Sequence, residues 1–212
     1  MLQHLMYIHY IYKKLRNMKK IFSILLLSSI SLGATAQNIV WNVDPTHTNV
    51  KFSVTHLMVS EVEGNFKTYN GKVESPSTDF NNGTVEFSID VNSINTESAD
   101  RDKHLMGDEF FNAAKYPKIT FKSTSFKKVA GNKYELIGDL TIRNITKKVT
   151  FDVKNNGLMK DPWGNMKAGF KATSKINRKD YDLKWSMVTE AGGMVVSDEV
   201  EITVNIELSQ AK

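Results

Sequence analysis

Three histidines beyond residue 36 are the side chains best suited to acid–base or metal chemistry: His47, His56 and His104. A zinc site needs three or four converging ligands, and its sequence pattern usually includes closely spaced pairs. No two of these histidines form such a pair. A metal-assisted enzyme would need all three imidazoles within about 5 Å of one another. We instead expect each to bond a nearby backbone group at the end of a strand or helix.

Other catalytic patterns are also missing from the sequence. There is no Gly-x-Ser-x-Gly nucleophile elbow, no glycine-rich phosphate loop and no cysteine. The lack of cysteine excludes disulfides and thiol catalysis. The adjacent carboxylates Asp108 and Glu109 fit a helix N-terminus or a solvated face. We therefore predict that the protein is not an enzyme, has no metal site and requires no cofactor.

The elements that must position any site are mostly β-strands. Apolar and polar residues alternate with the period of a half-buried strand, and the runs are rich in Val, Ile, Phe and Thr. These runs are Val50–Val54, Val62–Phe66, Tyr69–Val73, Val85–Val91, Ile119–Phe121, Tyr134–Ile142, Val149–Val153, Ala168–Ala172 and Val200–Leu208. Turn residues separate most of them, for example Asn155-Asn156-Gly157. The pattern predicts an all-β domain of eight or more strands.

The strand pattern also indicates how the sheet ends. A sheet with one solvent-exposed face and one buried face is typical of antiparallel pairing. A sheet of this size would leave long unpaired edges unless it closed on itself or folded over. We predict an antiparallel β-barrel of about eight strands, with a sandwich as the alternative.

One segment, Asn95–Ala114, lacks the alternation and is expected to form a short helical insert of one or two helices. Thr96 or Ser98 can cap the first helix and Asp108 the second. Pro117 follows the segment and ends it.

The insert carries a mixed charge run, Asp100–Lys103, which has two interpretations. Such a run is typical of a solvated helix face. Alternatively, Arg101 or Asp102 lies at the barrel mouth and faces the polar head of a ligand. A guanidinium group suits this role because it can bond two oxygens of a phosphate or carboxylate.

Aromatic side chains are numerous on the predicted buried faces of the strands, and two interpretations of the barrel interior remain open. A barrel of about eight strands is just wide enough either to be filled by side chains or to hold one slim ligand. Strands of about ten residues give a tube about 30 Å long. If the barrel is hollow, the candidate ligand-binding residues are Phe52, Phe66, Phe87, Ile89, Arg101, Phe110, Phe111, Phe121, Trp163, Phe170 and Trp185.

The first 36 residues have the pattern of a secretory signal peptide with a short extension before it. From Met18, a basic start precedes an apolar run over residues 21–32 and a small-residue exit that ends at Ala36. Met18 is the expected true start; a longer basic n-region is the alternative. The apolar run is shorter than the roughly 20 residues of a membrane span, although a retained anchor is the other possibility. We predict cleavage near Ala36, a mature domain of residues 37–212, and a periplasmic or secreted location.

Loss of this leader changes the charge balance. The leader holds five of the 28 lysines and arginines and none of the 23 acidic residues, so 23 basic residues (28 minus five) face 23 acidic ones in the mature chain. The basic character of the whole chain belongs to the leader and does not indicate nucleic-acid binding.

Ten ordered motifs go beyond a generic strand pattern. They are WNVDPTH (41–47), VKFSVTHL (50–57), VEGNF (62–66), SINT (93–96), RDKHL (101–105), FF (110–111), YPKITF (116–121), GDLTI (138–142), INRKDY (176–181) and DEV (198–200). In this order, over residues 41–208, they resemble the YceI-like family of lipid- and polyisoprenoid-binding proteins.

The resemblance implies a lipocalin-like antiparallel barrel, usually periplasmic and often a homodimer. It also implies an elongated pocket for an isoprenoid chain, an isoprenoid quinone or a fatty-acid-like amphiphile. The chain departs from the family at Asn144 and Asp182, where the family tends to have glycine. Asn and Asp tolerate left-handed backbone better than most residues, so we expect both turns to survive.

Our leading hypothesis is an exported carrier for such an apolar amphiphile, with transient membrane contact and no chemistry on its cargo. The alternative is a non-enzymatic stress or adhesion-type barrel with a filled core and a surface binding site. The carrier predicts a hollow barrel with a few polar groups at one end. The alternative predicts a continuous core and an exposed apolar patch.

Overall fold

A computed structural model of the chain describes residues 6–7, 9–15, 37–189 and 192–212. The chain divides into two units, Met1–Ala36 and Gln37–Lys212. The expected signal peptide, which starts at Met18, lies outside the described residues. In the stretch before it, residues 6–7 and 9–15 are helical. Among the described helices, none has the length and apolarity to span a membrane.

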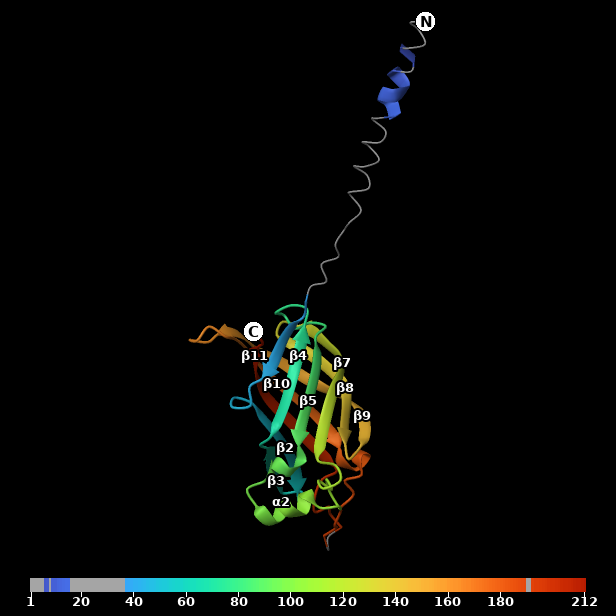
Figure 1. The fold of residues 1–212 in the computed structure, drawn as a ribbon. Helices are drawn as coiled ribbons and strands as arrows, with labels where there is room; N and C mark the ends of the chain where they lie inside the picture. Colours follow the sequence, from blue (N-terminus) through green and yellow to red (C-terminus); the bar gives the residue numbers. More distant parts are fainter. Residues whose placement is uncertain (1–5, 8, 16–36, 190–191) are drawn as a thin grey trace. The chain divides into compact units, whose positions relative to one another are not determined.

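The second unit is built almost entirely of strands (Figure 1). They are β1 (Ile39–Val43), β2 (Asn49–His56), β3 (Ser60–Phe66), β4 (Tyr69–Ser75), β5 (Thr84–Asp90), β6 (Ile94–Asn95), β7 (Lys118–Ala130), β8 (Lys133–Ile142), β9 (Ile145–Lys160), β10 (Met166–Asn177) and β11 (Glu199–Gln210). One α-helix, α2 (Ala99–Met106), and two 3₁₀ turns, η1 (Val91–Ser93) and η2 (Arg178–Tyr181), complete the unit.

Eight of these strands close into a ring. The order is β1-β4-β5-β7-β8-β9-β10-β11, and β11 returns to pair with β1. Every pairing is antiparallel, and β2, β3 and β6 continue the sheet from β11. The predicted antiparallel barrel of about eight strands with a helical insert is confirmed.

The long strand β11 pairs with two different strands along its length. Its C-terminal end pairs with β1, with Leu208 opposite Val43, and its earlier part pairs with β2, with Val204 opposite Val50. The loop of residues 44–48 lets the chain step away between the two. The ring is therefore closed by β1 near one end of the barrel, and the extra strands β2 and β3 continue the wall toward the other end.

The helical insert forms one helix rather than two. Asn95 belongs to β6, and α2 ends at Met106 with Gly107 as its C-cap. Asp108 caps no helix, because residues 108–116 form turns in which the amide of Asn112 donates to the carbonyl of Gly107. Asn144 and Asp182 adopt left-handed backbone, with φ of 61° and 62°, as expected for residues that replace glycine in such turns.

The closed end of the barrel is filled with aromatic side chains. Trp41 and Phe80 are fully buried, with ring centroids 5.0 Å apart, and Phe80 meets Phe170 edge-on at 4.9 Å. Phe126 packs between Phe170 and Tyr134. We call Trp41, Phe80, Phe126, Tyr134 and Phe170 the aromatic plug. The Tyr134 hydroxyl donates to the Asp79 carbonyl at 2.5 Å, so the polar group of Tyr134 has a hydrogen-bond partner.

Candidate functional site

The other end of the barrel contains a cavity of about 440 Å³. This volume lies within the usual range for small-molecule sites. The inner faces of strands β2, β5, β7, β8 and β11 supply most of the wall, and the insert with α2 contributes the rest. No member of the aromatic plug lines this cavity. The barrel is therefore filled at one end and hollow at the other.

Glycines on the inner face help to keep the lumen open. Gly64 on β3 lies directly opposite Phe52 on β2, and a Cβ at Gly64 would stand 2.3 Å from the Phe52 ring. Gly71 on β4 lies opposite Phe87 on β5, where a Cβ would stand 2.5 Å from the ring. Each phenylalanine therefore lies over a glycine of the neighbouring strand, against the wall and not across the lumen.

A third pair repeats this arrangement deeper in the barrel. A Cβ at Gly138 on β8 would stand 2.4 Å from the Phe121 ring on β7 and 2.5 Å from the Lys122 carbonyl oxygen. Phe121 also meets Phe151 edge-on, with ring centroids 5.4 Å apart. Aromatic rings that cover glycines are a known arrangement in β-sheets, and here the arrangement leaves the lumen wider.

The cavity lining is apolar apart from a few groups toward the insert. The Arg101 guanidinium donates from Nε to the Thr96 hydroxyl at 2.8 Å and from Nη2 to the Thr96 carbonyl at 2.5 Å. Arg101 and Thr96 both line the cavity. Asp102 instead faces Thr96, accepting from its amide at 2.8 Å and its hydroxyl at 2.6 Å. Of the two predicted head-group residues, only Arg101 reaches the cavity, because Asp102 is engaged in holding the start of the insert.

A second arginine of the lining, Arg178, is buried. It donates from Nε to the Ser197 carbonyl and from Nη1 to the carbonyls of Leu183 and Trp185, at 2.6–2.9 Å. Burial lowers the pKa of Arg178, while the nearby Asp198 carboxylate opposes that shift. Arg178 thus ties the segment after η2 to the barrel and places a cation in the cavity wall. Sequence reasoning did not select Arg178, although it lies in the INRKDY motif.

The three histidines do not converge. His104 lies edge-on to Phe110 and Trp185, at 5.0 and 5.7 Å, and lines the cavity. His56 also lines the cavity, at the end of β2. His47 lies elsewhere, in the loop between β1 and β2, where its Nδ1 is 3.2 Å from the Asp44 carboxylate.

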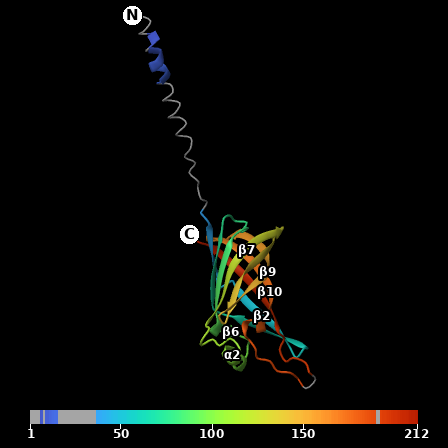
Figure 2. The ribbon, with the colours of Figure 1, turned by 90° about the vertical axis from the view of Figure 1, so that its right-hand side faces the viewer.

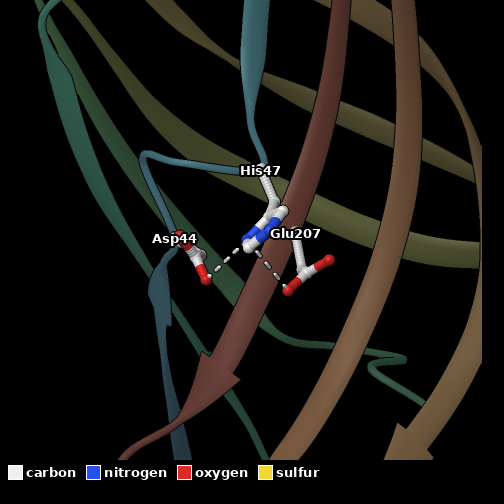
Figure 3. Close-up of side chains that lie close together, drawn as sticks. All are labelled: Asp44, His47 and Glu207. Carbon is white, nitrogen blue, oxygen red and sulfur yellow. Dashed lines mark hydrogen bonds and ion pairs between the residues drawn. The ribbon is translucent and has the colours of Figure 1, made fainter. Parts of the chain in front are cut away.

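The surroundings of His47 give the one group of three potential metal ligands in the described residues: Asp44, His47 and Glu207 (Figure 3). Their ligand atoms lie within 4.8 Å of one another. The Lys167 ammonium is 2.7 Å from Asp44 and 3.2 Å from Glu207, so a cation of the protein itself already pairs with both carboxylates. The hydrogen bond from Lys167 is the largest cause that holds the pKa of Asp44 well below its usual range. We interpret this group as an ion-pair network that joins β1, β10 and β11.

Nine of the eleven candidate ligand-binding residues meet around the cavity. They are Phe52, Phe66, Phe87, Ile89, Arg101, Phe110, Phe111, Phe121 and Trp185. Phe170 belongs to the aromatic plug, and Trp163 is 84% exposed in the turn between β9 and β10. Neither residue lines the cavity. The structure adds Thr96, His56 and Arg178 to the lining.

Comparison with known proteins gives concordant matches. A sequence model of the YceI-like domain matches residues 41–208. Protein YceI of Salmonella newport (strain SL254) is 40% identical over 170 residues, which are 78% of this chain and 83% of that protein. The crystal structure of the Campylobacter jejuni YCEI protein is 31% identical, with a TM-score of 0.64 over 74% of this chain and 90% of that one.

A more distant structure shares the fold. It is a polyisoprenoid binding domain from Saccharophagus degradans, implicated in plant cell wall breakdown. It is 17% identical, with a TM-score of 0.56 over 81% of this chain and 98% of that domain.

Proposed function

The chain belongs to the YceI-like family, and from this premise we propose that it binds a long apolar amphiphile inside its barrel and carries it without chemical change. The cargo class is a polyisoprenoid, an isoprenoid quinone or a fatty-acid-like lipid. The polyisoprenoid-binding function named for the Saccharophagus degradans domain supports the first of these classes.

The single observation that carries this proposal is the contrast within the barrel. The cavity of about 440 Å³ has an almost wholly apolar wall, whereas the closed end is packed with aromatic rings. A cavity of this kind suits a hydrocarbon chain, since each buried CH₂ contributes about 0.8 kcal/mol. A filled barrel with only a surface site, the alternative from the sequence, would not leave an apolar cavity of this volume in its lumen.

The distribution of polar groups suggests an orientation for the cargo. Arg101, Arg178 and His104 belong to the insert and the segment from η2 onward, while Phe121 and Phe151 lie toward the plug. We therefore place the polar head near the arginines and the tail toward Phe121. An arginine can bond a phosphate, carboxylate or quinone oxygen.

The test is extraction of the protein from its native compartment with organic solvent, followed by mass spectrometry. A stoichiometric polyprenyl, quinone or fatty-acyl species is expected. A clean extract, repeated after incubation of the protein with a total lipid extract of the host, would contradict the proposal.

Trp185 offers a second measurement because it lines the cavity while Trp163 is exposed and Trp41 is buried in the plug. In a variant with Trp41→Phe and Trp163→Phe, the remaining Trp185 fluorescence should change as a lipid ligand is added. The matched variant that retains only Trp163 should not respond. The reverse result would place the ligand outside the cavity.

We further propose that the protein is exported by its leader to the periplasm or the exterior. Balanced charge in the mature chain and the absence of cysteine are compatible with that location. N-terminal sequencing of the exported protein should begin at Gln37. A chain that retains its leader would contradict cleavage near Ala36. A homodimer remains a prediction from the family resemblance, and light scattering of the processed protein would test it.

A further inference from the structure

An exposed apolar surface lies at the end of the barrel that carries α2. Its members are Leu57, Met58, Val59, Met187 and Val188, with exposed fractions between 42% and 83%. The first three form the turn between β2 and β3, and the other two lie in the segment after η2. We call these five residues the apolar rim. Both ribbon views place these two segments at the same end of the barrel (Figures 1 and 2).

The two parts of the apolar rim are joined by backbone hydrogen bonds. The Leu57 amide donates to the Val195 carbonyl at 2.9 Å, and the Val195 amide donates to the Met187 carbonyl at 2.9 Å. The Met58 sulfur would lie 3.3 Å from a Cβ placed at Gly193. The five side chains are therefore parts of one surface on a hydrogen-bonded scaffold.

The backbone of the turn gives a second reason to regard this surface as functional. Leu57 and Met58 have positive φ angles of 51° and 63°. Gly, Asn and Asp are the residues that suit such a hairpin turn, and bulky apolar residues there are uncommon and strained. Leucine and methionine therefore occupy a turn whose backbone favours other residues, and both are exposed there.

The apolar rim is continuous with the cavity. His56, directly before the turn, and Val195, bonded to Leu57, both line the cavity. Val54 and Val62 extend the lining along β2 and β3 toward the same turn. An apolar chain at this end of the cavity would therefore meet apolar side chains, and not charged ones, at the apolar rim.

We propose that the apolar rim docks onto the surface of a lipid bilayer and inserts its five side chains there, so that cargo moves between bilayer and cavity without crossing water. This inference rests on the proposed function, because the bilayer is where a long apolar amphiphile resides. The geometry favours a bilayer over a second copy of the chain, since the side chains stand on the β2–β3 turn and on the segment held by the Val188–Met194 bridge, and not in a groove. Proteins that bind at the bilayer interface do so in proportion to the apolar area they bury there.

The charge balance sharpens the proposal. The chain beyond the leader has equal numbers of basic and acidic residues, so attraction to anionic lipids is not the main driving force. Docking should occur on phosphatidylcholine vesicles and should change little between 50 mM and 500 mM salt, because burial of apolar area is not screened by ions.

The experiment is flotation with phosphatidylcholine vesicles, using the naturally processed protein purified from its host. The test variant is Met58→Asp with Val188→Asp; Asp suits the left-handed backbone at position 58, and both side chains are mostly exposed, so the fold should persist. The control variant is Met159→Asp with Trp163→Asp, because these residues are equally exposed near the β9–β10 turn, away from the cavity. We expect the test variant to lose about tenfold in vesicle affinity and the control to stay within about twofold.

The outcomes separate this inference from the proposed function. Cargo content, measured by extraction and mass spectrometry after loading from detergent, should be unchanged in the test variant. If the wild type binds vesicles but contains no cargo after loading, the carrier function is contradicted and the docking proposal is not. Three results would overturn the docking proposal. The first is loss of vesicle binding only in the control variant, and the second is no vesicle binding by the wild type. The third is conversion of a dimer to a monomer by the test variant.

Discussion

The two ends of this barrel use the same residue types for opposite purposes. At the closed end, Phe80 packs against both Trp41 and Phe170, and the three rings fill the lumen. At the hollow end, Phe52 and Phe87 lie over glycines and leave the lumen free. The difference teaches that an inward-facing phenylalanine on a strand does not by itself make a core. What stands beside the ring, on the neighbouring strand or on a loop at the end of the barrel, decides whether the ring fills space or lines it.

The comparison also divides stability from binding. Rings in the aromatic plug are surrounded by protein on all sides, whereas Phe52, Phe87 and Ile89 are only partly buried although they face inward. Dense packing contributes most where contacts are complete. The plug end should therefore carry much of the folding free energy, and the hollow end should gain its missing contacts from a ligand.

The largest expected effect comes from removing a plug ring. Phe80→Ala should lower the free energy of unfolding by about 3–5 kcal/mol, because it leaves a cavity in a fully packed cluster. Phe52→Ala is the matched variant at the hollow end and should cost clearly less, since that ring already borders empty space. Urea unfolding of the ligand-free protein measures both. Equal losses at the two positions would break the comparison.

The next effect tests the glycines. Gly64→Ala should push the Phe52 ring into the lumen and weaken cargo binding by about tenfold, with a stability loss of about 1–3 kcal/mol from overpacking. A Cβ at Gly64 would meet only side chains, the Phe52 ring and, at 2.8 Å, the Thr96 methyl group, whereas one at Gly138 would also meet the backbone at 2.5 Å. Cargo affinity is measured by Trp185 fluorescence.

A second substitution supplies the control for this prediction. Adding Phe52→Leu to Gly64→Ala should restore most of the lost affinity, because the smaller side chain vacates the space that the new methyl group needs. Failure of that rescue, with the fold intact, would show that Gly64 does not act through the ring.

A smaller effect is expected at the network that joins β1, β10 and β11. Lys167→Met should lower stability by about 1 kcal/mol at pH 7, since Asp44 and Glu207 lose their cation. The pKa of Asp44 is depressed in the folded protein, so its contribution is present above the usual carboxylate pKa near 4 and is lost as pH falls through the depressed value. The difference between variant and wild type should therefore shrink in acid. Thermal unfolding between pH 7 and pH 2 measures it, and a difference that grows in acid would contradict this account.

The smallest effect is expected at Trp163. Because this ring is 84% exposed and does not line the cavity, Trp163→Ser should change the free energy of unfolding by no more than about 0.5 kcal/mol and leave cargo affinity unchanged. Loss of cargo in this variant would place the ligand somewhere other than the hollow end.

The sequence by itself determined the strands, their antiparallel pairing and the short insert, because alternation and turn residues are local properties of the chain. It also indicated the left-handed turns at Asn144 and Asp182, which depend only on backbone preference. A period of two assigns each strand residue to one side of the sheet, and five strand candidates, Phe52, Phe66, Phe87, Ile89 and Phe121, do line the cavity.

Only the tertiary structure decided which inward rings line the cavity and which fill the plug. Phe170 and Phe52 are alike in the sequence, each an apolar residue in an alternating strand. They differ because Phe170 meets Phe80 of the β4–β5 loop, whereas Phe52 lies opposite Gly64 on the next strand. These neighbours come from distant parts of the chain or from strand register, and alternation along one strand carries no information about what stands across from it.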